Sequence, residues 1–207
     1  QKGVVAEGYI KEARQKIAAT LKVDPKELII TSGGTESNNM ALIGTALAAK
    51  RKGNHIITTA VEHPSVKATA SFLEEQGFRI TFLSVDSRGQ ISLEDLKEAL
   101  TPDTILVSIM YVNNEIGTIQ PVEEAAKLVH ATVPGAVFHV DAIQAYGKVM
   151  IRPKQQGIDL LSVSSHKFHG PKGAGFLYCS SKVNLHPIIF GGGQQSGMRS
   201  GTENVPG

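Results

Sequence analysis

Five polar motifs each follow a short apolar run, and their side chains are of types that bind charged groups or react with them. The first is the turn Ser32-Gly33-Gly34-Thr35, which precedes a helical pattern. Glycines there let backbone N–H groups approach an anion at the helix N-terminus, so the turn could bind a phosphate. A strand-to-helix turn with Ser32 or Thr35 as the N-cap fits equally well. The sequence matches neither the P-loop nor the dinucleotide-binding glycine pattern.

The stretch Ser164-Ser165-His166-Lys167 contains the strongest candidate for covalent chemistry. Lys167 follows an apolar run and precedes a loop rich in glycine and proline. We therefore expect a partly desolvated amine with a lowered pKa, which could form a Schiff base with an aldehyde. Lys172 is the weaker candidate. His166 and His169 could form a metal-ligand pair, but no further ligand stands at a zinc-site spacing, so we expect no metal ion.

Three further motifs contribute an imidazole, amides and a carboxylate. His63, in Glu62-His63-Pro64-Ser65, could equally be a simple helix-entry residue, and the pair Asn113-Asn114 could equally form a turn. Asp141 follows a buried strand, with Gln144 three residues later. A buried carboxylate needs a cation or several donors, so Asp141 is either a helix cap or the partner of a ligand cation.

Together these motifs offer an anion seat, an imidazole, amides, a carboxylate and a lysine. Pyridoxal phosphate needs a seat for its phosphate, a carboxylate for its pyridinium nitrogen and a lysine for its aldehyde. The sequence therefore favours this cofactor over a metal ion, provided that the motifs meet in space.

The elements that must position the motifs alternate between strands and helices. Strands are predicted at 28–31, 55–59, 79–85, 104–110, 136–140, 160–164 and 175–178, and helices at 10–21, 36–50, 65–76, 92–100 and 121–133. The strands are apolar without alternation, which indicates a mainly parallel sheet covered by helices on both faces, an α/β/α sandwich. Ten residues separate the last two strands, too few for a parallel crossover, so this pair is predicted to be antiparallel. In such sheets ligands bind at the carboxyl ends of the strands, where all five motifs fall.

Composition narrows the function further. The 207 residues suit one large domain, and a net charge of +2 from 21 basic and 19 acidic residues gives no footprint for nucleic acid or a membrane surface. The single cysteine, Cys179, excludes an intrachain disulfide and fits a reducing, cytoplasmic compartment. The longest apolar stretch is too short to span a bilayer, so we expect no membrane helix.

As an ordered set, the motifs resemble those of the cysteine desulfurases, which are fold-type I pyridoxal-phosphate enzymes of the class V aminotransferase group. The stretches that carry the resemblance are 31–38, 62–63, 113–117, 139–144, 164–167 and 198–202. The resemblance extends over nearly the whole chain but only about the central half of a full-length member. It implies that residues 1–207 are the cofactor-binding large domain of a longer enzyme, without its N-terminal segment and its C-terminal small domain.

The resemblance also implies roles for individual residues. Lys167 would carry the cofactor aldehyde, Asp141 would face the pyridine nitrogen, and His63 would stack on the ring and move protons. Asn114 and Gln144 would contact oxygens of the substrate or cofactor. The residues implied to hold the phosphate are Gly34, Thr35, Ser164 and His166, with Thr202 reaching the phosphate of a second subunit. The last role implies a homodimer.

The family reaction converts L-cysteine to L-alanine and leaves a persulfide on an enzyme cysteine. That sulfur passes to an acceptor protein, such as an iron–sulfur scaffold, for cluster assembly or thiolation. Cys179 lies in a predicted strand and not in the later mobile loop that carries the family's nucleophile. We interpret it as a structural residue and expect the chain by itself to be inactive.

Three alternatives remain open at this stage. A selenocysteine lyase or another class V enzyme would keep the same lysine, aspartate and histidine. A non-catalytic scaffold could still bind pyridoxal phosphate. A nucleotide-binding α/β domain is disfavoured because the sequence has neither glycine fingerprint.

Overall fold

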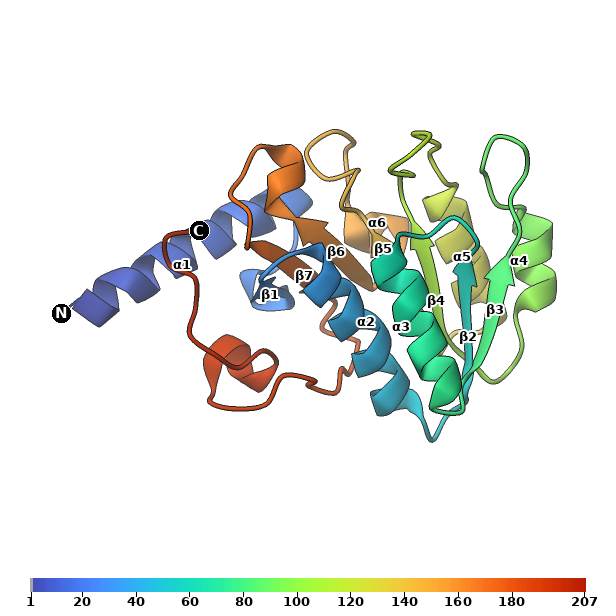
Figure 1. The fold of residues 1–207 in the computed structure, drawn as a ribbon, viewed down its shortest axis with the longest axis horizontal. Helices are drawn as coiled ribbons and strands as arrows, with labels where there is room; N and C mark the ends of the chain where they lie inside the picture. Colours follow the sequence, from blue (N-terminus) through green and yellow to red (C-terminus); the bar gives the residue numbers. More distant parts are fainter. Residues whose placement is uncertain (1) are drawn as a thin grey trace.

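The computed structural model describes residues 2–207, in which helices alternate with the strands of a single seven-stranded sheet (Figure 1). The strands are β1 Leu28–Thr31, β2 His55–Thr59, β3 Arg79–Leu83, β4 Thr104–Met110, β5 Val137–Asp141, β6 Leu160–Ser164 and β7 Gly175–Cys179. The α-helices are α1 Lys2–Leu21, α2 Gly34–Ala49, α3 Pro64–Glu75, α4 Leu93–Ala99, α5 Val122–Thr132 and α6 Pro153–Gln156. Short 3-10 turns occupy Pro25–Glu27 (η1), Ser165–Phe168 (η2) and Gln194–Gly197 (η3).

The sheet order is β1-β7-β6-β5-β4-β2-β3. Strands β2 to β6 pair in parallel, whereas β7 runs antiparallel to both of its neighbours, β1 and β6. This confirms the predicted mainly parallel sheet and the predicted antiparallel pairing of the last two strands, β6 and β7. The loop between β6 and β7 is therefore a hairpin-like connection, which places β7 between β6 and the edge strand β1 without a crossover helix.

Hydrophobic residues fill both faces of the sheet. In β2, Ile56 belongs to the core beneath α2 and α3, while its neighbour Ile57 belongs to the core beneath α4 and α5. Successive side chains of a strand point to opposite faces, so a strand covered on both sides buries neighbouring residues such as Ile56 and Ile57 in two different cores. This explains why the strands show no alternation, and it confirms the predicted α/β/α sandwich.

Of the two interpretations of the turn before α2, the one with Ser32 or Thr35 as the helix cap is wrong. The N-cap is Gly33, with φ of 148°, and neither Ser32 nor Thr35 caps the helix. Instead, the carboxylate of Glu36 accepts hydrogen bonds from the backbone N–H (3.1 Å) and the hydroxyl of Ser32. The acidic side chain in the first turn of α2 thus holds the preceding turn at Ser32, while no side chain caps the helix itself in the described structure.

The two ends of the described chain lie on the same side of the molecule (Figure 1). The first part of α1 extends away from the sheet, and its Val4, Val5 and Tyr9 are exposed. The segment after β7 passes beside the edge strand β1, where the Oε1 atom of Gln195 accepts a hydrogen bond from the Ile30 backbone N–H at 2.8 Å. Within residues 2–207, no helix is long and apolar enough to cross a membrane.

Candidate active site

A cavity of about 240 Å³ lies at the carboxyl ends of β4, β5 and β6. Nine of the ten predicted site residues line this cavity in the described part of the chain. They are Gly34, Thr35, His63, Asn114, Asp141, Gln144, Ser164, His166 and Lys167. They come from positions 34 to 167 and meet because parallel strands bring their carboxyl ends to one edge of the sheet. Met110, Val112 and Ile143 complete the lining with apolar surface.

Asp141 is the last residue of β5 and is only 4% exposed. Its Oδ1 atom accepts from the Ile143 backbone N–H at 3.0 Å, and its Oδ2 atom accepts from the Asn38 amide at 2.8 Å. Burial raises the pKa of Asp141 above its ordinary value, and these two donors oppose that rise. A carboxylate in this setting gains from a cation in the cavity, because a cation would offset the cost of its burial.

Asn38 is a site residue to which the sequence analysis assigned no role. Its Nδ2 atom donates to Asp141 and to the Ser65 hydroxyl at 2.9 Å, so it fixes the carboxylate from behind. Its Oδ1 atom is buried and has no hydrogen-bond partner among residues 2–207. A usable signal was present, since Asn38 follows Gly34 by four residues and therefore lies on the same face of α2.

His63 has the helix-entry position that one interpretation predicted, and it also lies beside the cavity. It is the N-cap of α3, and its Nδ1 atom accepts from the Ser65 backbone N–H at 3.1 Å. The same residue lines the cavity. Because Nδ1 is an acceptor in the cap, a neutral ring carries its proton on Nε2.

The glycine-rich turn packs closely against neighbouring elements. A Cβ atom on Gly34 would lie 2.1 Å from the Ile143 Cδ1 atom, and a Cβ atom on Gly175 would lie 2.7 Å from the Gly33 Cα atom. A second cavity of about 310 Å³ lies on the outer side of this turn. It shares Gly34, Thr35, Ser164 and His166 with the first cavity. The first backbone N–H groups of α2 have no partners within the helix, so they can bind an anion between the two cavities.

Lys167 lies in the 3-10 turn η2, one residue beyond His166. It lines the cavity, but the residue is exposed, so the prediction of a partly desolvated amine is wrong for this structure. The physical reason is that η2 begins where β6 ends, which places Lys167 at the rim instead of inside the sheet edge. Lys172 lines only the outer cavity.

The adjacent asparagines have different roles. Asn113 is buried, its Oδ1 atom accepts from the backbone N–H of Glu115 and Ile116, and its Nδ2 atom donates to the Val61 carbonyl. It therefore forms the turn, as one of the two interpretations predicted. Asn114 lines the cavity.

Glu62 is a second buried carboxyl group near Asp141. Its Oε1 atom accepts from the Thr59 hydroxyl at 2.9 Å and from the Met110 backbone N–H at 2.8 Å. Its Oε2 atom has no partner within the described part of the chain. Burial and the nearby charge of Asp141 raise the pKa of Glu62 to about 8. The sequence motif contained Glu62, but only the fold shows that two carboxyl groups share this region.

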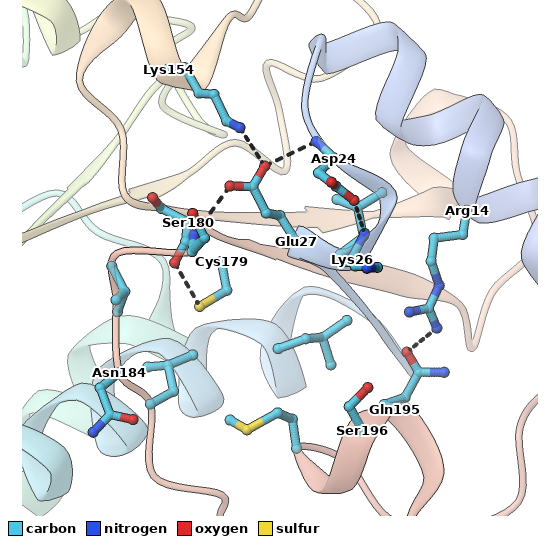
Figure 2. Close-up of a pocket in the computed structure, with 16 residues that line it drawn as sticks. Arg14, Asp24, Lys26, Glu27, Lys154, Cys179, Ser180, Asn184, Gln195 and Ser196 are labelled. Carbon is cyan, nitrogen blue, oxygen red and sulfur yellow. Dashed lines mark hydrogen bonds and ion pairs between the residues drawn. The ribbon is translucent and has the colours of Figure 1, made fainter.

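Two residues lie apart from the cavity. Thr202 is exposed and is not among the lining residues. Cys179, at the end of β7, lies in a different cavity of about 420 Å³, shown in Figure 2 with Glu27 and Lys154. The two cavities share no lining residue within the described chain. Burial raises the pKa of the Cys179 thiol to about 12, which agrees with the structural interpretation of this residue.

Comparison with known proteins gives consistent results. The family model described as aminotransferase class V matches residues 3–207. A putative cysteine desulfurase IscS 1 of Bacillus subtilis is 54% identical over 199 residues, which are 96% of this chain and 52% of the relative. A cysteine desulfurase IscS of Dictyoglomus turgidum is 52% identical, over 96% of this chain and 50% of the relative. The chain thus spans about half the length of the curated relatives it matches.

Solved structures match along the entire fold. A NifS-like protein superimposes with a TM-score of 0.97 at 44% identity, covering 100% of this chain and 57% of that one. SspA in complex with cysteine has a TM-score of 0.94 at 41% identity, covering 99% and 59%. DndA from Streptomyces lividans has a TM-score of 0.91 at 45% identity, also covering 99% and 59%.

Proposed function

Because the chain belongs to the class V aminotransferase family, we propose that its protein is a pyridoxal-phosphate-dependent cysteine desulfurase. Residues 1–207 would form the cofactor-binding large domain. The observation that carries the proposal is the convergence of a lysine, a buried carboxylate, an imidazole and a helix N-terminus on one cavity. The family depends on pyridoxal phosphate, so these residues should suit the ring nitrogen, the aldehyde and the phosphate of that cofactor.

The residues of the cavity fit the cofactor on two structural observations. The carboxylate of Asp141 is buried and held by neutral donors, which suits a protonated ring nitrogen as its counter-charge. The turn before α2 packs so tightly that Cβ atoms on Gly34 and Gly175 would force their neighbours to shift. In the described structure the helix has no side-chain cap, so its first backbone N–H groups can receive a phosphate. When bound, pyridoxal phosphate would supply an electron sink for bond cleavage at the substrate α-carbon.

The chain's own residues would divide the work as follows. Asp141 would hold the proton of the ring nitrogen, while Asn38 and the Ile143 N–H fix the orientation of its carboxylate. His63 would stack on the ring, with its position set by the cap hydrogen bond to Ser65. Lys167 would provide the amine that binds the aldehyde and later carries a proton at Nζ.

The remaining residues would bind oxygen atoms. Asn114 and Gln144 would contact oxygens of the substrate or the ring. The phosphate would be held by Gly34, Thr35, Ser164 and His166, with Thr202 of a second copy completing the seat. This last role requires a homodimer, which the exposure of Thr202 allows.

We also propose L-cysteine as the substrate and a sulfur-acceptor protein as the partner, in a reducing cytoplasmic compartment. The names of the curated relatives support the substrate, as does a structural neighbour described in complex with cysteine. Cys179 is a poor sulfur carrier, because its thiol has a raised pKa and lies in a cavity away from Lys167. The 207-residue chain by itself is therefore expected to release no sulfide from L-cysteine.

Absorbance spectroscopy tests the proposal. Purified chain is mixed with pyridoxal phosphate and dialysed, and a visible band that survives dialysis is expected for the wild type but not for Lys167→Ala. Lys97→Ala, an exposed lysine on α4, serves as the control and should keep the band. Borohydride reduction followed by peptide mapping should then find the adduct on Lys167. A band that persists in Lys167→Ala, or an adduct on Lys172, would contradict the assignment.

A further inference from the structure

A partly buried ion pair links the C-terminal segment to the start of α2. The Arg199 Nε atom donates to the Glu36 Oε1 atom at 2.7 Å, and its Nη2 atom donates to Oε2 at 3.3 Å. The two side chains are 21% and 13% exposed, respectively. A two-pronged, partly buried contact of this kind is stronger than an ordinary surface ion pair. Neither Arg199 nor Glu36 is among the residues proposed to bind the cofactor, so the role of this ion pair has to be found elsewhere.

Glu36 shapes the turn that precedes α2. It is the third residue of the helix, and its Oε2 atom also accepts from the backbone N–H and hydroxyl of Ser32. No side chain caps the helix at Gly33 in the described structure. The carboxylate of Glu36 therefore holds the turn in place, and Arg199 holds that carboxylate.

The charge of Glu36 matters as much as its shape. Glu36 lines the outer cavity together with Gly34, Thr35 and Ser164, which are the residues proposed to bind the phosphate. Burial raises the pKa of Glu36, but hydrogen bonds from Arg199 and Ser32 outweigh it and hold the pKa below its usual value. The group is thus an anion beside an anion seat, and without Arg199 it would repel a phosphate.

Arg199 is itself held by an anchored segment. Four residues earlier, Gln195 is buried, and its Oε1 atom accepts from the Arg14 side chain at 2.7 Å (Figure 2). The same oxygen also accepts from the Ile30 backbone N–H. Ile30 belongs to β1, the strand that leads into the Ser32 turn. The segment that carries Arg199 is therefore fixed to the same strand as the turn it reaches.

We propose that Arg199 and Glu36 are positioning residues for the cofactor phosphate. Glu36 holds the turn in the shape that exposes its N–H groups, and Arg199 cancels the charge that would otherwise repel the phosphate. Neither side chain needs to touch the cofactor. This inference rests on the proposed function and adds to it the means by which the chain selects a phosphorylated ligand.

The test compares pyridoxal phosphate with pyridoxal, which has the same ring and aldehyde but no phosphate. Dissociation constants of both ligands are measured by absorbance titration for the full chain and its variants. In Arg199→Met, the affinity for pyridoxal phosphate should fall on the order of tenfold, because an unpaired carboxylate then lies beside the phosphate. The affinity for pyridoxal should stay unchanged. Arg199→Lys keeps the charge and should lose less.

A second substitution separates charge from damage to the fold. Adding Glu36→Gln to Arg199→Met removes the unpaired charge, so the double variant should recover most of the preference for pyridoxal phosphate. Arg79→Met, which breaks the exposed pair with Asp103 at the other end of the sheet, should change neither affinity. Equal weakening of both ligands in Arg199→Met, or no recovery in the double variant, would overturn the inference. A wild-type chain that binds neither ligand would overturn the proposed function, and the inference with it.

Discussion

The parallel strands carry buried polar side chains at both ends, and the hydrogen bonding of these side chains differs between the two ends. At the amino ends, His55 is fully buried, with its Nδ1 atom 2.8 Å from the Thr104 hydroxyl and its Nε2 atom 2.8 Å from the Thr81 hydroxyl. Arg79 and Asp103 form an ion pair beside it. Burial lowers the pKa of His55 to about 4, so the ring is a neutral structural part.

At the carboxyl ends, the polar groups are not all satisfied. The Asn38 Oδ1 and Glu62 Oε2 atoms are buried without a partner among the residues described, and Asp141 faces a cavity. Buried polar atoms in native proteins are nearly always hydrogen-bonded, so the exceptions require an explanation. The difference teaches that buried polarity alone does not mark a site. Incomplete hydrogen bonding beside a cavity is the better indicator.

The largest expected effect concerns the pH dependence of stability at the carboxyl ends. The pKa of Glu62 is raised from 4.5 to about 8 in the folded chain. The folded state therefore holds a proton that the unfolded state releases, and the free energy of unfolding should fall as pH rises through this window, by up to ~1.4 kcal/mol per pH unit. In Glu62→Gln this fall should be reduced.

Urea unfolding at several pH values between the two pKa values and above them measures this effect. The stability of Glu62→Gln relative to the wild type should increase with pH, because the variant has no proton to lose. Glu115→Gln, at an exposed position, serves as the control and should track the wild type. Parallel curves for Glu62→Gln and the wild type would show that the buried carboxyl group is not the source of the slope.

The next effect tests how rigid the amino ends are. A Cβ atom on Gly53 would lie 2.2 Å from the Asp103 carbonyl oxygen, a backbone atom that cannot easily move. Gly53→Ala should lower the free energy of unfolding by about 3 kcal/mol. Gly135→Ala is the matched control, since its Cβ atom would meet nothing within 4 Å in the described structure. The folded fraction of Gly53→Ala should bind pyridoxal phosphate with the wild-type affinity. A lower affinity of this variant would show that the amino ends of the strands also contribute to binding.

Asp141→Asn should have the opposite effect to Gly53→Ala, with unchanged or higher stability and a lower affinity for pyridoxal phosphate. Its unfolding free energy at neutral pH should stay the same or rise, because a buried charge disappears and the amide of Asn38 can turn its unpartnered Oδ1 atom toward the introduced amide. Its affinity for pyridoxal phosphate should fall on the order of 100-fold, equivalent to ~2.7 kcal/mol. Unfolding curves and absorbance titrations of the same preparations measure both quantities. If Asp141→Asn lost stability but kept its affinity for pyridoxal phosphate, Asp141 would be a structural residue and not a ligand of the cofactor.

Most of the fold could be predicted from the sequence, because most strands carry consecutive apolar residues and the starts of α3, α4 and α5 lie at a proline or a serine. Antiparallel pairing of β7 followed from the short connection alone. The site was predictable to the level of motifs, since the carboxyl ends of parallel strands must meet. Even so, His139 lies in one of those motifs and proves to be a core residue, bonded to the hydroxyls of Ser108 and Ser162.

What the sequence could not supply were contacts between distant side chains. The Asn38–Asp141 hydrogen bond spans 103 positions and the Arg199–Glu36 pair spans 163. Neither has a local pattern, because each depends on how α2 lies over the sheet and how the last segment returns to β1. The sequence did not predict the exposure of Lys167 for a similar reason. The position of its amine at the rim of the cavity depends on where η2 begins after β6.

The smallest expected effect compares two threonines directly. Thr104 is bonded through its hydroxyl to His55 and to the Thr101 N–H at 3.0 Å, whereas the buried hydroxyl of Thr58 has no partner within residues 2–207. Thr104→Val should therefore cost about 1 kcal/mol of unfolding free energy, a loss limited by the Thr101 hydroxyl, which also lies 3.1 Å from the His55 Nδ1 atom.

Thr58→Val removes a hydroxyl that makes no bond, so the same change of shape should be neutral or stabilising. Neither substitution should alter the affinity for pyridoxal phosphate. Because both residues are buried threonines in neighbouring strands, the sign of the difference depends on hydrogen bonding and not on burial. If Thr58→Val were as costly as Thr104→Val, the cost would follow burial instead of hydrogen bonding, and the contrast between this pair of threonines would fail.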